Sequence, residues 1–140
     1  MPSRRKSREY AMQMLYQWEV GGNTPEQVEA SFLLERKPDG GVATFARELF
    51  LGTVNNLSKL DRLLKQHAQN WRLERMAAVD RSILRLAAYE ILCTPDVPPR
   101  AVINEALEIA RRFSGQSSIE FINGILDAIL KSLSRPQTRA

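Results

Sequence analysis

The sequence begins with basic side chains of the type that binds phosphate. Four of them precede the first acidic residue of the chain: Arg4, Arg5, Lys6 and Arg8. Guanidinium groups present a planar fork that fits two phosphate oxygens, and they also stack on bases. We therefore predict that residues 1–8 form a polyanion-binding arm, which stays mobile until RNA orders it. The alternative, from charge alone, is a disordered tail that only keeps the protein soluble.

An aromatic ring follows this basic cluster at helical spacing. Arg8, Met12 and Tyr16 are four residues apart, which places them on one side of a first helix. Leu15 and Trp18, on the opposite side, are expected to face the core. A ring beside guanidinium groups suits an unstacked base, so Tyr16 is predicted to contact RNA. The alternative is that the Tyr16 ring packs on the protein with its hydroxyl group in water.

Two further arginines, Arg81 and Arg85, are four residues apart and share a helix face. They could extend a track of cations along a phosphate backbone, and we count both as predicted RNA-binding residues. The alternative is that each forms an ion pair within the protein. For Arg85 the acids considered include Asp80 and Glu90.

Residues suited to catalysis or metal binding are scarce. His67 is the only histidine and Cys93 the only cysteine, which excludes a Cys/His zinc cluster. The sequence contains no phosphate-binding loop and no dinucleotide-binding motif. Glu105 and Glu108, three residues apart, are typical of a solvated helix face. We therefore predict a protein that is not an enzyme and that holds no metal or cofactor.

The excess positive charge is concentrated at the N-terminus. Twenty Lys and Arg residues against sixteen Asp and Glu residues give a net charge of +4. The four basic residues before Glu9 equal this excess, so the rest of the chain is balanced. No apolar run is long enough to cross a bilayer, and no apolar signal region follows the charged N-terminus. We expect a cytoplasmic protein without membrane contact, and the single cysteine fits a reducing compartment.

The spacing of apolar residues is helical nearly throughout and predicts an all-α fold. The first helix ends at Gly21–Gly22, and capping boxes are expected at Thr24–Gln27 and at Ser117–Glu120. Loops are expected at 37–41 and 95–99. The helical stretches between these signals are 44–67, interrupted at Gly52 or at Asn55–Asn56, then 73–93, whose first part can be a separate short helix, and 102–113. Asn104 and Asn123 are expected to form buried hydrogen bonds, and Gly124 to allow close helix contact.

Several segments together resemble the NusB family of bacterial transcription antitermination factors. They are Ser7–Glu9, Ala11–Trp18, Val79–Glu90, Asp96–Pro98, Val102–Ala106 and Phe121–Asp127. They extend over almost the whole chain in the right order. The resemblance implies a single domain over residues 1–140, built from about six or seven helices in two packed sub-bundles. Residues 136–140 are expected to form a flexible tail.

The resemblance also implies function and partners. It implies binding of single-stranded boxA RNA in ribosomal-RNA leader transcripts, together with the ribosomal protein NusE, within an antitermination complex on RNA polymerase. It assigns RNA contact to the basic arm and to Tyr16. Contact with NusE, or a position beside the RNA, is assigned to Asp80, Phe113, Ser117 and Phe121, although Phe113 and Phe121 could instead be core residues. The alternatives are a protein-only module, such as a homodimer that covers the RNA face, and an accessory domain of an RNA methyltransferase.

Overall fold

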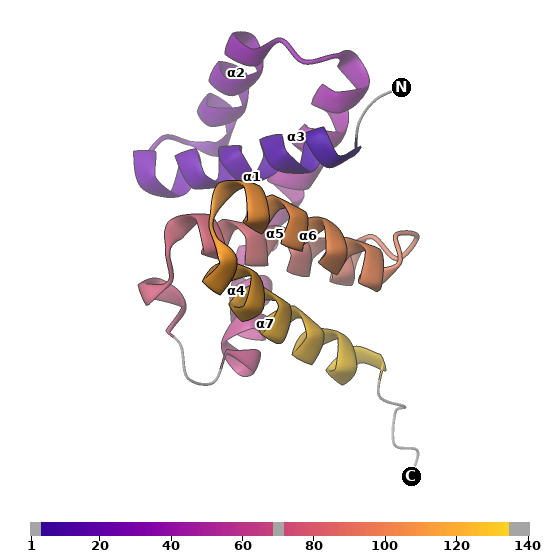
Figure 1. Ribbon diagram of the computed structural model, residues 1–140. Coiled ribbons are helices and arrows are strands. Elements are labelled where there is room, and N and C mark those ends of the chain that lie inside the picture. Colours follow the sequence, from indigo (N-terminus) through magenta and orange to yellow (C-terminus); the bar gives the residue numbers. More distant parts are fainter. Residues whose placement is uncertain (1–3, 69–71, 135–140) are drawn as a thin grey trace.

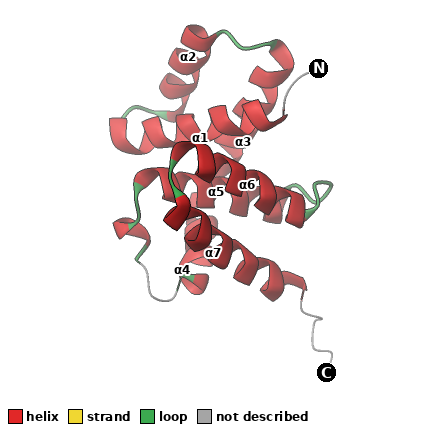
Figure 2. Cartoon of the chain, in the orientation of Figure 1, coloured by secondary structure: helices red, strands yellow, loops and turns green. Residues whose placement is uncertain are grey.

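The computed structural model describes residues 4–68 and 72–134, and this part of the chain contains helices and no strand (Figures 1 and 2). Its helices are α1 (Arg4–Gly21), α2 (Pro25–Arg36), α3 (Gly40–Asn55), α4 (Leu57–His67), the 3-10 helix η1 (Leu73–Arg75), α5 (Ala78–Cys93), α6 (Pro99–Phe113) and α7 (Gln116–Ser134). The all-α prediction is confirmed. None of these helices is long and apolar enough to cross a membrane.

The first helix begins earlier than the sequence suggested. Residues 4–8 were expected to form a mobile arm, but α1 already starts at Arg4. Ser7 explains part of this order, because its buried hydroxyl group donates a 3.0 Å hydrogen bond to the carbonyl oxygen of Val42 in α3. The cations of this segment are therefore held at fixed helical positions. The predictions for residues 1–3 and for the tail at 136–140 lie outside the described residues.

Local signals set several helix ends. The Thr24 side chain accepts a hydrogen bond from the Gln27 backbone, and the Gln27 side chain accepts one from the Thr24 backbone, which confirms the first capping box. The loop predicted at 37–41 is shorter than expected, because α3 already begins at Gly40. The capping box predicted at Ser117 is wrong, because α7 begins one residue earlier, at Gln116.

The break predicted within the long helical stretch occurs at Asn56, between α3 and α4. Gly52, the other candidate for this break, lies inside α3 and has a packing role instead. A Cβ atom at Gly52 would collide with the hydroxyl oxygen and the Cζ atom of Tyr89 in α5. The absence of a side chain at Gly52 therefore lets α3 and α5 approach each other closely.

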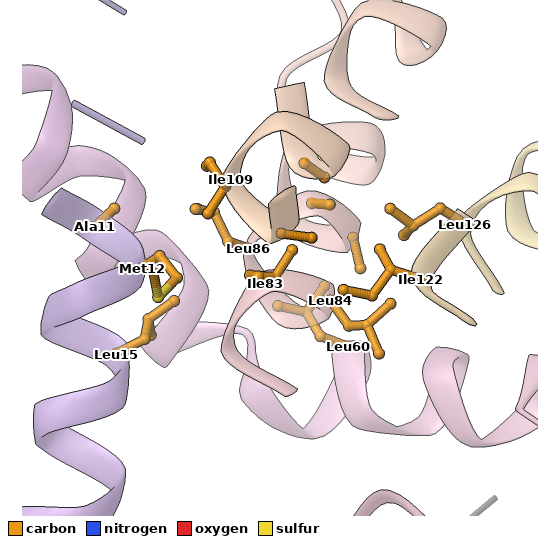
Figure 3. Close-up of a cluster of buried hydrophobic side chains, with 14 of the residues drawn as sticks. Ala11, Met12, Leu15, Leu60, Ile83, Leu84, Leu86, Ile109, Ile122 and Leu126 are labelled. Atoms are coloured by element: carbon orange, nitrogen blue, oxygen red, sulfur yellow. The ribbon is translucent and has the colours of Figure 1, made fainter. Parts of the chain in front are cut away.

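Helix α5 joins the two halves of the molecule. Helix α1 packs on α2, α3 and α5, whereas α4, α6 and α7 pack on α5 from other sides. Figure 3 shows Ile83, Leu84 and Leu86 of α5 between Met12 of α1 and Leu126 of α7. All five side chains are buried. The structure thus has two sub-bundles, α1–α3 and α4–α7, that share one apolar core.

Three polar or small positions differ from expectation. Asn104 and Asn123 are exposed, so they do not form the buried hydrogen bonds predicted for them. Gly124 is exposed as well, and a Cβ atom there would meet no atom within 4 Å. Close helix contact therefore does not depend on Gly124.

Candidate nucleic-acid and partner interface

The first turn of α1 presents two exposed guanidinium groups. The Arg4 guanidinium carbon lies 4.5 Å from the ring centroid of Phe45, which is a cation–π contact. Arg5 donates two hydrogen bonds to the Glu105 carboxylate of α6, at 2.9 Å from Nε and 3.0 Å from Nη2. The Arg5 side chain is still 54% exposed. Both cations can therefore reach a ligand, although Arg5 must exchange or share its carboxylate.

Glu105 is electrostatically matched to Arg5. The hydrogen bond from Arg5 holds the pKa of the Glu105 carboxyl group below its ordinary value of 4.5, and the nearby charges of Arg5 and Arg8 act in the same direction. The pair is therefore fully charged at neutral pH. A phosphate group that binds Arg5 bidentately has to compete with this carboxylate.

The cation at position 8 has different surroundings. Arg8 is 6% exposed, and its Nε and Nη2 atoms each donate a 2.8 Å hydrogen bond to the carboxylate of Glu90, which is 1% exposed. The prediction that Arg8 offers its fork to RNA is therefore revised, because the fork already holds a buried carboxylate. Met12 is also corrected: it is 2% exposed and belongs to the core rather than to an RNA face.

Glu9 links the basic end of α1 to the end of α6. The Lys6 ammonium group lies 3.6 Å from the Glu9 carboxylate, which also accepts hydrogen bonds of 2.9 and 3.0 Å from Arg112 Nη1. The Arg112 guanidinium in turn lies 5.2 Å from the ring centroid of Phe113. The contacts of Lys6, Glu9 and Arg112 therefore connect the start of α1 with Phe113 at the end of α6.

Tyr16 and Phe113 line one surface pocket of about 300 Å³ between α1, α2, α5 and α6. The other lining residues are Met12, Gln13, Gln17, Arg36 and Val79. The Tyr16 side chain is exposed, at 38%, so its ring is available for stacking. The Oε1 atom of Gln13 is buried and has no hydrogen-bond partner among the described residues. The residues that line the pocket therefore include two aromatic rings and a glutamine whose side-chain oxygen is buried and unpaired.

Asp80, Ser117 and Phe121 lie together at a second pocket of about 310 Å³. Its remaining lining residues are Arg75, Met76, Ala77 and Ser118. The Asp80 carboxylate accepts 2.8 Å hydrogen bonds from Ser118 Oγ and from Ser114 Oγ. Asp80 therefore stabilises the junction between α6 and α7. It does not form an ion pair with Arg85, which was one alternative from the sequence.

Arg81 and Arg85 take part in an ion-pair network between α1, α4 and α5. Arg85 donates two hydrogen bonds to Asp61, at 2.8 and 2.9 Å, and one of 2.9 Å to Glu19. Arg81 donates to both carboxylate oxygens of Glu19. Each arginine side chain is only 12% exposed. The paired alternative is therefore correct for both, with Asp61 and Glu19 as partners instead of the acids considered from sequence.

The position of Arg81 within the protein also affects its pKa. Burial, together with the neighbouring charge of Arg85, lowers the pKa of the Arg81 guanidinium. Arginine has so high an ordinary pKa that Arg81 stays protonated at neutral pH. Its charge is therefore committed to the Glu19 carboxylate.

Several lining residues of these surfaces were not identified from the sequence. Gln13 and Arg36 line the pocket of Tyr16, and Glu105 and Arg112 form ion pairs with residues of the first turns of α1. These contacts join positions far apart in the chain, and no local motif indicates them. No group of three His, Cys, Asp or Glu side chains within residues 4–68 and 72–134 is arranged to hold a metal ion.

A family model for the NusB family matches residues 5–131. This chain belongs to the NusB family. The transcription antitermination protein NusB of Koribacter versatilis is 48% identical over 132 residues, which cover 94% of this chain and 90% of the relative. The NusB protein of Sorangium cellulosum is 40% identical over 135 residues, which cover 96% of each chain. The resemblance seen in the sequence is thus confirmed.

Solved NusB structures agree with this assignment. A structure of T. maritima NusB has a TM-score of 0.84 and 37% identity, and covers 94% of this chain and 93% of its own. A crystal structure of the antitermination factors NusB and NusE in complex with dsRNA has a TM-score of 0.85, covering 92% and 96%. At 23% identity, the latter supports the fold alone. As a NusB-family member the chain is a transcription antitermination factor and not an enzyme.

Proposed function

We propose that this factor binds single-stranded boxA RNA of ribosomal-RNA leader transcripts together with the ribosomal protein NusE, and joins the antitermination complex on RNA polymerase in the cytoplasm. The observation that carries the proposal is the exposed basic first turn of α1 on a chain that matches the NusB family from residue 5 to residue 131. Phosphate contacts supply most of the affinity of such interfaces, and base contacts supply their specificity.

The proposed RNA path starts at Arg4, Arg5 and Lys6 and leads to Tyr16. The first three side chains bind phosphates, and Arg5 does so by exchanging Glu105 for the RNA. Tyr16 then stacks on an unpaired base in the pocket that it shares with Phe113. Base stacking on an aromatic ring contributes about 1–3 kcal/mol per base. Arg8, Arg81 and Arg85 support this surface from within, since their forks are occupied by carboxylates.

NusE is proposed to dock at the pocket of Asp80, Ser117 and Phe121 and to reach Phe113, which lines the other pocket. Phe121 supplies apolar contact area, and the exposed Ser117 hydroxyl can bond to a partner backbone. The solved NusB of the same fold that is described in complex with NusE and dsRNA motivates the choice of these two partner classes. The RNA in that complex is double-stranded, so the test below also compares single-stranded with double-stranded RNA.

The test is a fluorescence-anisotropy titration with three RNAs of equal length: single-stranded boxA, a scrambled single strand and a boxA duplex. Each is titrated with and without NusE. The proposal predicts that single-stranded boxA binds most tightly and that NusE strengthens this binding. Equal affinity for boxA and scrambled RNA would reduce the function to unspecific binding of polyanions. Tighter binding of the duplex would contradict single-strand recognition.

Two variants connect the result to the surface. Tyr16→Ala should weaken boxA binding about 5- to 100-fold, while Tyr16→Phe, which keeps the ring, should bind like the wild type.

Light scattering of the protein without RNA or NusE tests for a homodimer that covers the RNA face. If the free chain is a dimer and RNA never binds, even with NusE, the protein-only alternative is correct.

A further inference from the structure

The pocket of Asp80, Ser117 and Phe121 has two walls from distant parts of the chain. One wall is the start of α7, with Ser117, Ser118 and Phe121, and the other is the segment 75–77, which begins with the last residue of η1. The first wall is held by the two 2.8 Å hydrogen bonds to the Asp80 carboxylate. The second wall lies outside any α-helix, so it needs a support of its own.

Arg81, the next residue of α5, provides that support. Its Nη1 atom donates hydrogen bonds of 2.8 Å to the carbonyl oxygen of Leu73 and 2.7 Å to that of Met76. The other edge of the guanidinium is fixed by Glu19, which accepts from Nε at 3.0 Å and from Nη2. Arg81 thus ties the end of α1 to the backbone on both sides of Arg75.

The wall itself has few bonds of its own. Within it, the Arg75 amide donates to Arg72 over 3.0 Å and the Met76 amide donates to Leu73 over 3.2 Å. A three-residue 3-10 turn of this kind has poorer hydrogen-bond geometry than an α-helix. The two carbonyl bonds from Arg81, together with the buried side chains of Leu73 and Met76, therefore fix its position.

Arg75 is the group that this support places at the pocket. It is exposed, and it is the only cation among the described residues that line the pocket. It has no ion-pair partner within residues 4–68 and 72–134. Its guanidinium can therefore bind an anionic or carbonyl group of a partner that fills the pocket.

We propose that Arg81 is a positioning residue for the partner pocket, because it holds the wall that carries Arg75 without touching the partner itself. This inference rests on the proposed docking of NusE at the same pocket. The role needs arginine. An ammonium group is a compact point charge and cannot bond to both oxygens of Glu19 and to two carbonyl oxygens at once.

The test compares Arg81→Lys with Arg85→Lys. Both substitutions keep the positive charge, and both residues bond to Glu19 in the same ion-pair network. They differ in that Arg85 has no hydrogen bond to segment 73–76. Arg81→Lys should accelerate hydrogen exchange at the Arg75 and Met76 amides at least tenfold and weaken NusE binding about tenfold. Arg85→Lys should leave both within about twofold, whatever it does to global stability.

The salt dependence of RNA binding separates positioning from direct contact. With Arg81→Gln, which removes the positive charge, the slope of log affinity against log salt should be that of the wild type. A phosphate contact through the Arg81 fork would instead reduce the slope by about 0.7, and that result would overturn the proposal. The proposal would also be overturned if Arg81→Lys accelerated exchange at the Arg75 and Met76 amides but left the affinity for NusE unchanged.

Phe121→Ala keeps this inference distinguishable from the proposed function. If the wild type binds NusE and Phe121→Ala weakens the binding while Arg81→Lys does not, only the positioning role is wrong. If Phe121→Ala has no effect, or the wild type does not bind NusE, the docking site is wrong and the inference falls with it. If Arg81→Lys fails to fold, Arg81→Gln, which keeps one donor group, is measured instead. Its results are interpreted in the same way.

Discussion

At the scale of single residues, the arginines in the first two turns of α1 have different roles. Arg4 and Arg5 are exposed, while Arg8 is buried with its fork on Glu90. All three side chains carry the same charge, so their surroundings decide which of them can bind a ligand. A buried guanidinium that has lost water needs a carboxylate nearby, whereas an exposed one can exchange partners.

Arg8→Ala should lower the free energy of unfolding by about 3–5 kcal/mol, because it leaves the Glu90 carboxylate buried without its partner. Urea unfolding measures this loss. The matched control is Arg62→Ala on the exposed side of α4, which should change stability by less than about 0.5 kcal/mol. A loss below about 1 kcal/mol for Arg8→Ala would show that the pair is not important for folding.

Glu105→Gln should strengthen RNA binding several-fold, because it removes the carboxylate that competes with phosphate for Arg5. The control Glu108→Gln removes the same charge from the same helix, but Glu108 pairs with Arg111 and not with the start of α1. Anisotropy titration of both variants checks the claim. Equal gains would mean that only net charge matters, and no gain would mean that Arg5 does not contact RNA.

At the scale of helices, local signals predicted where elements begin and end, and distant contacts decided the rest. The capping box at Thr24 and the break at Asn56 depend on neighbouring residues, so the sequence predicts them. The bonds from Arg8 to Glu90 join residues 82 positions apart, and no spacing rule indicates such a pair. Asn104 and Gly124 were misjudged because residue type alone does not tell which helix face is outside.

Gly52→Ala should destabilise the protein by about 1–3 kcal/mol, because the added Cβ atom would overlap the Tyr89 ring across the α3–α5 contact. In a Tyr89→Leu background the same change should be stabilising by up to about 1 kcal/mol, since alanine has the better helix propensity. A double-mutant cycle from urea unfolding measures this coupling. Additive effects would mean that the close approach at Gly52 is not important for packing.

At the scale of the whole molecule, charged groups on the exterior join helices that the core already brings together. Glu105 ties α6 to α1 through Arg5, and Asp127 of α7 pairs with Arg100 of α6 and with Lys131. The all-helical fold and its sub-bundles were predictable from apolar spacing and family resemblance. The network that supports the pockets was not, because it depends on how those sub-bundles meet.

Acid should weaken the fold in a defined range. The pKa of Glu105 is lowered from 4.5, chiefly by its hydrogen bond from Arg5, and that of Asp127 is lowered from 3.8, chiefly by that from Lys131. A carboxyl group whose pKa is lower in the folded state contributes stability above its unfolded pKa and loses it as pH falls through the folded value. These two groups should therefore contribute no pH dependence between pH 7 and about 5.5.

Urea unfolding at a series of pH values measures this dependence. The double variant Glu105→Gln, Asp127→Asn should be less stable than the wild type near neutral pH, and the difference should disappear in acid. A difference that persists below both folded pKa values would mean that the two carboxylates act by packing and not by charge.

The central claim is that the exposed cations of the first turn of α1 bind RNA phosphates. The most direct measurement is the affinity for single-stranded boxA RNA, with NusE present, over a range of salt concentrations. Three phosphate contacts contribute about 2 to the slope of log affinity against log salt. Changing Arg4, Arg5 and Lys6 to Ala should remove this contribution, while changing the exposed Arg62, Arg100 and Arg111 should leave the slope as it is. Equal slopes for the two triple variants would contradict the claim.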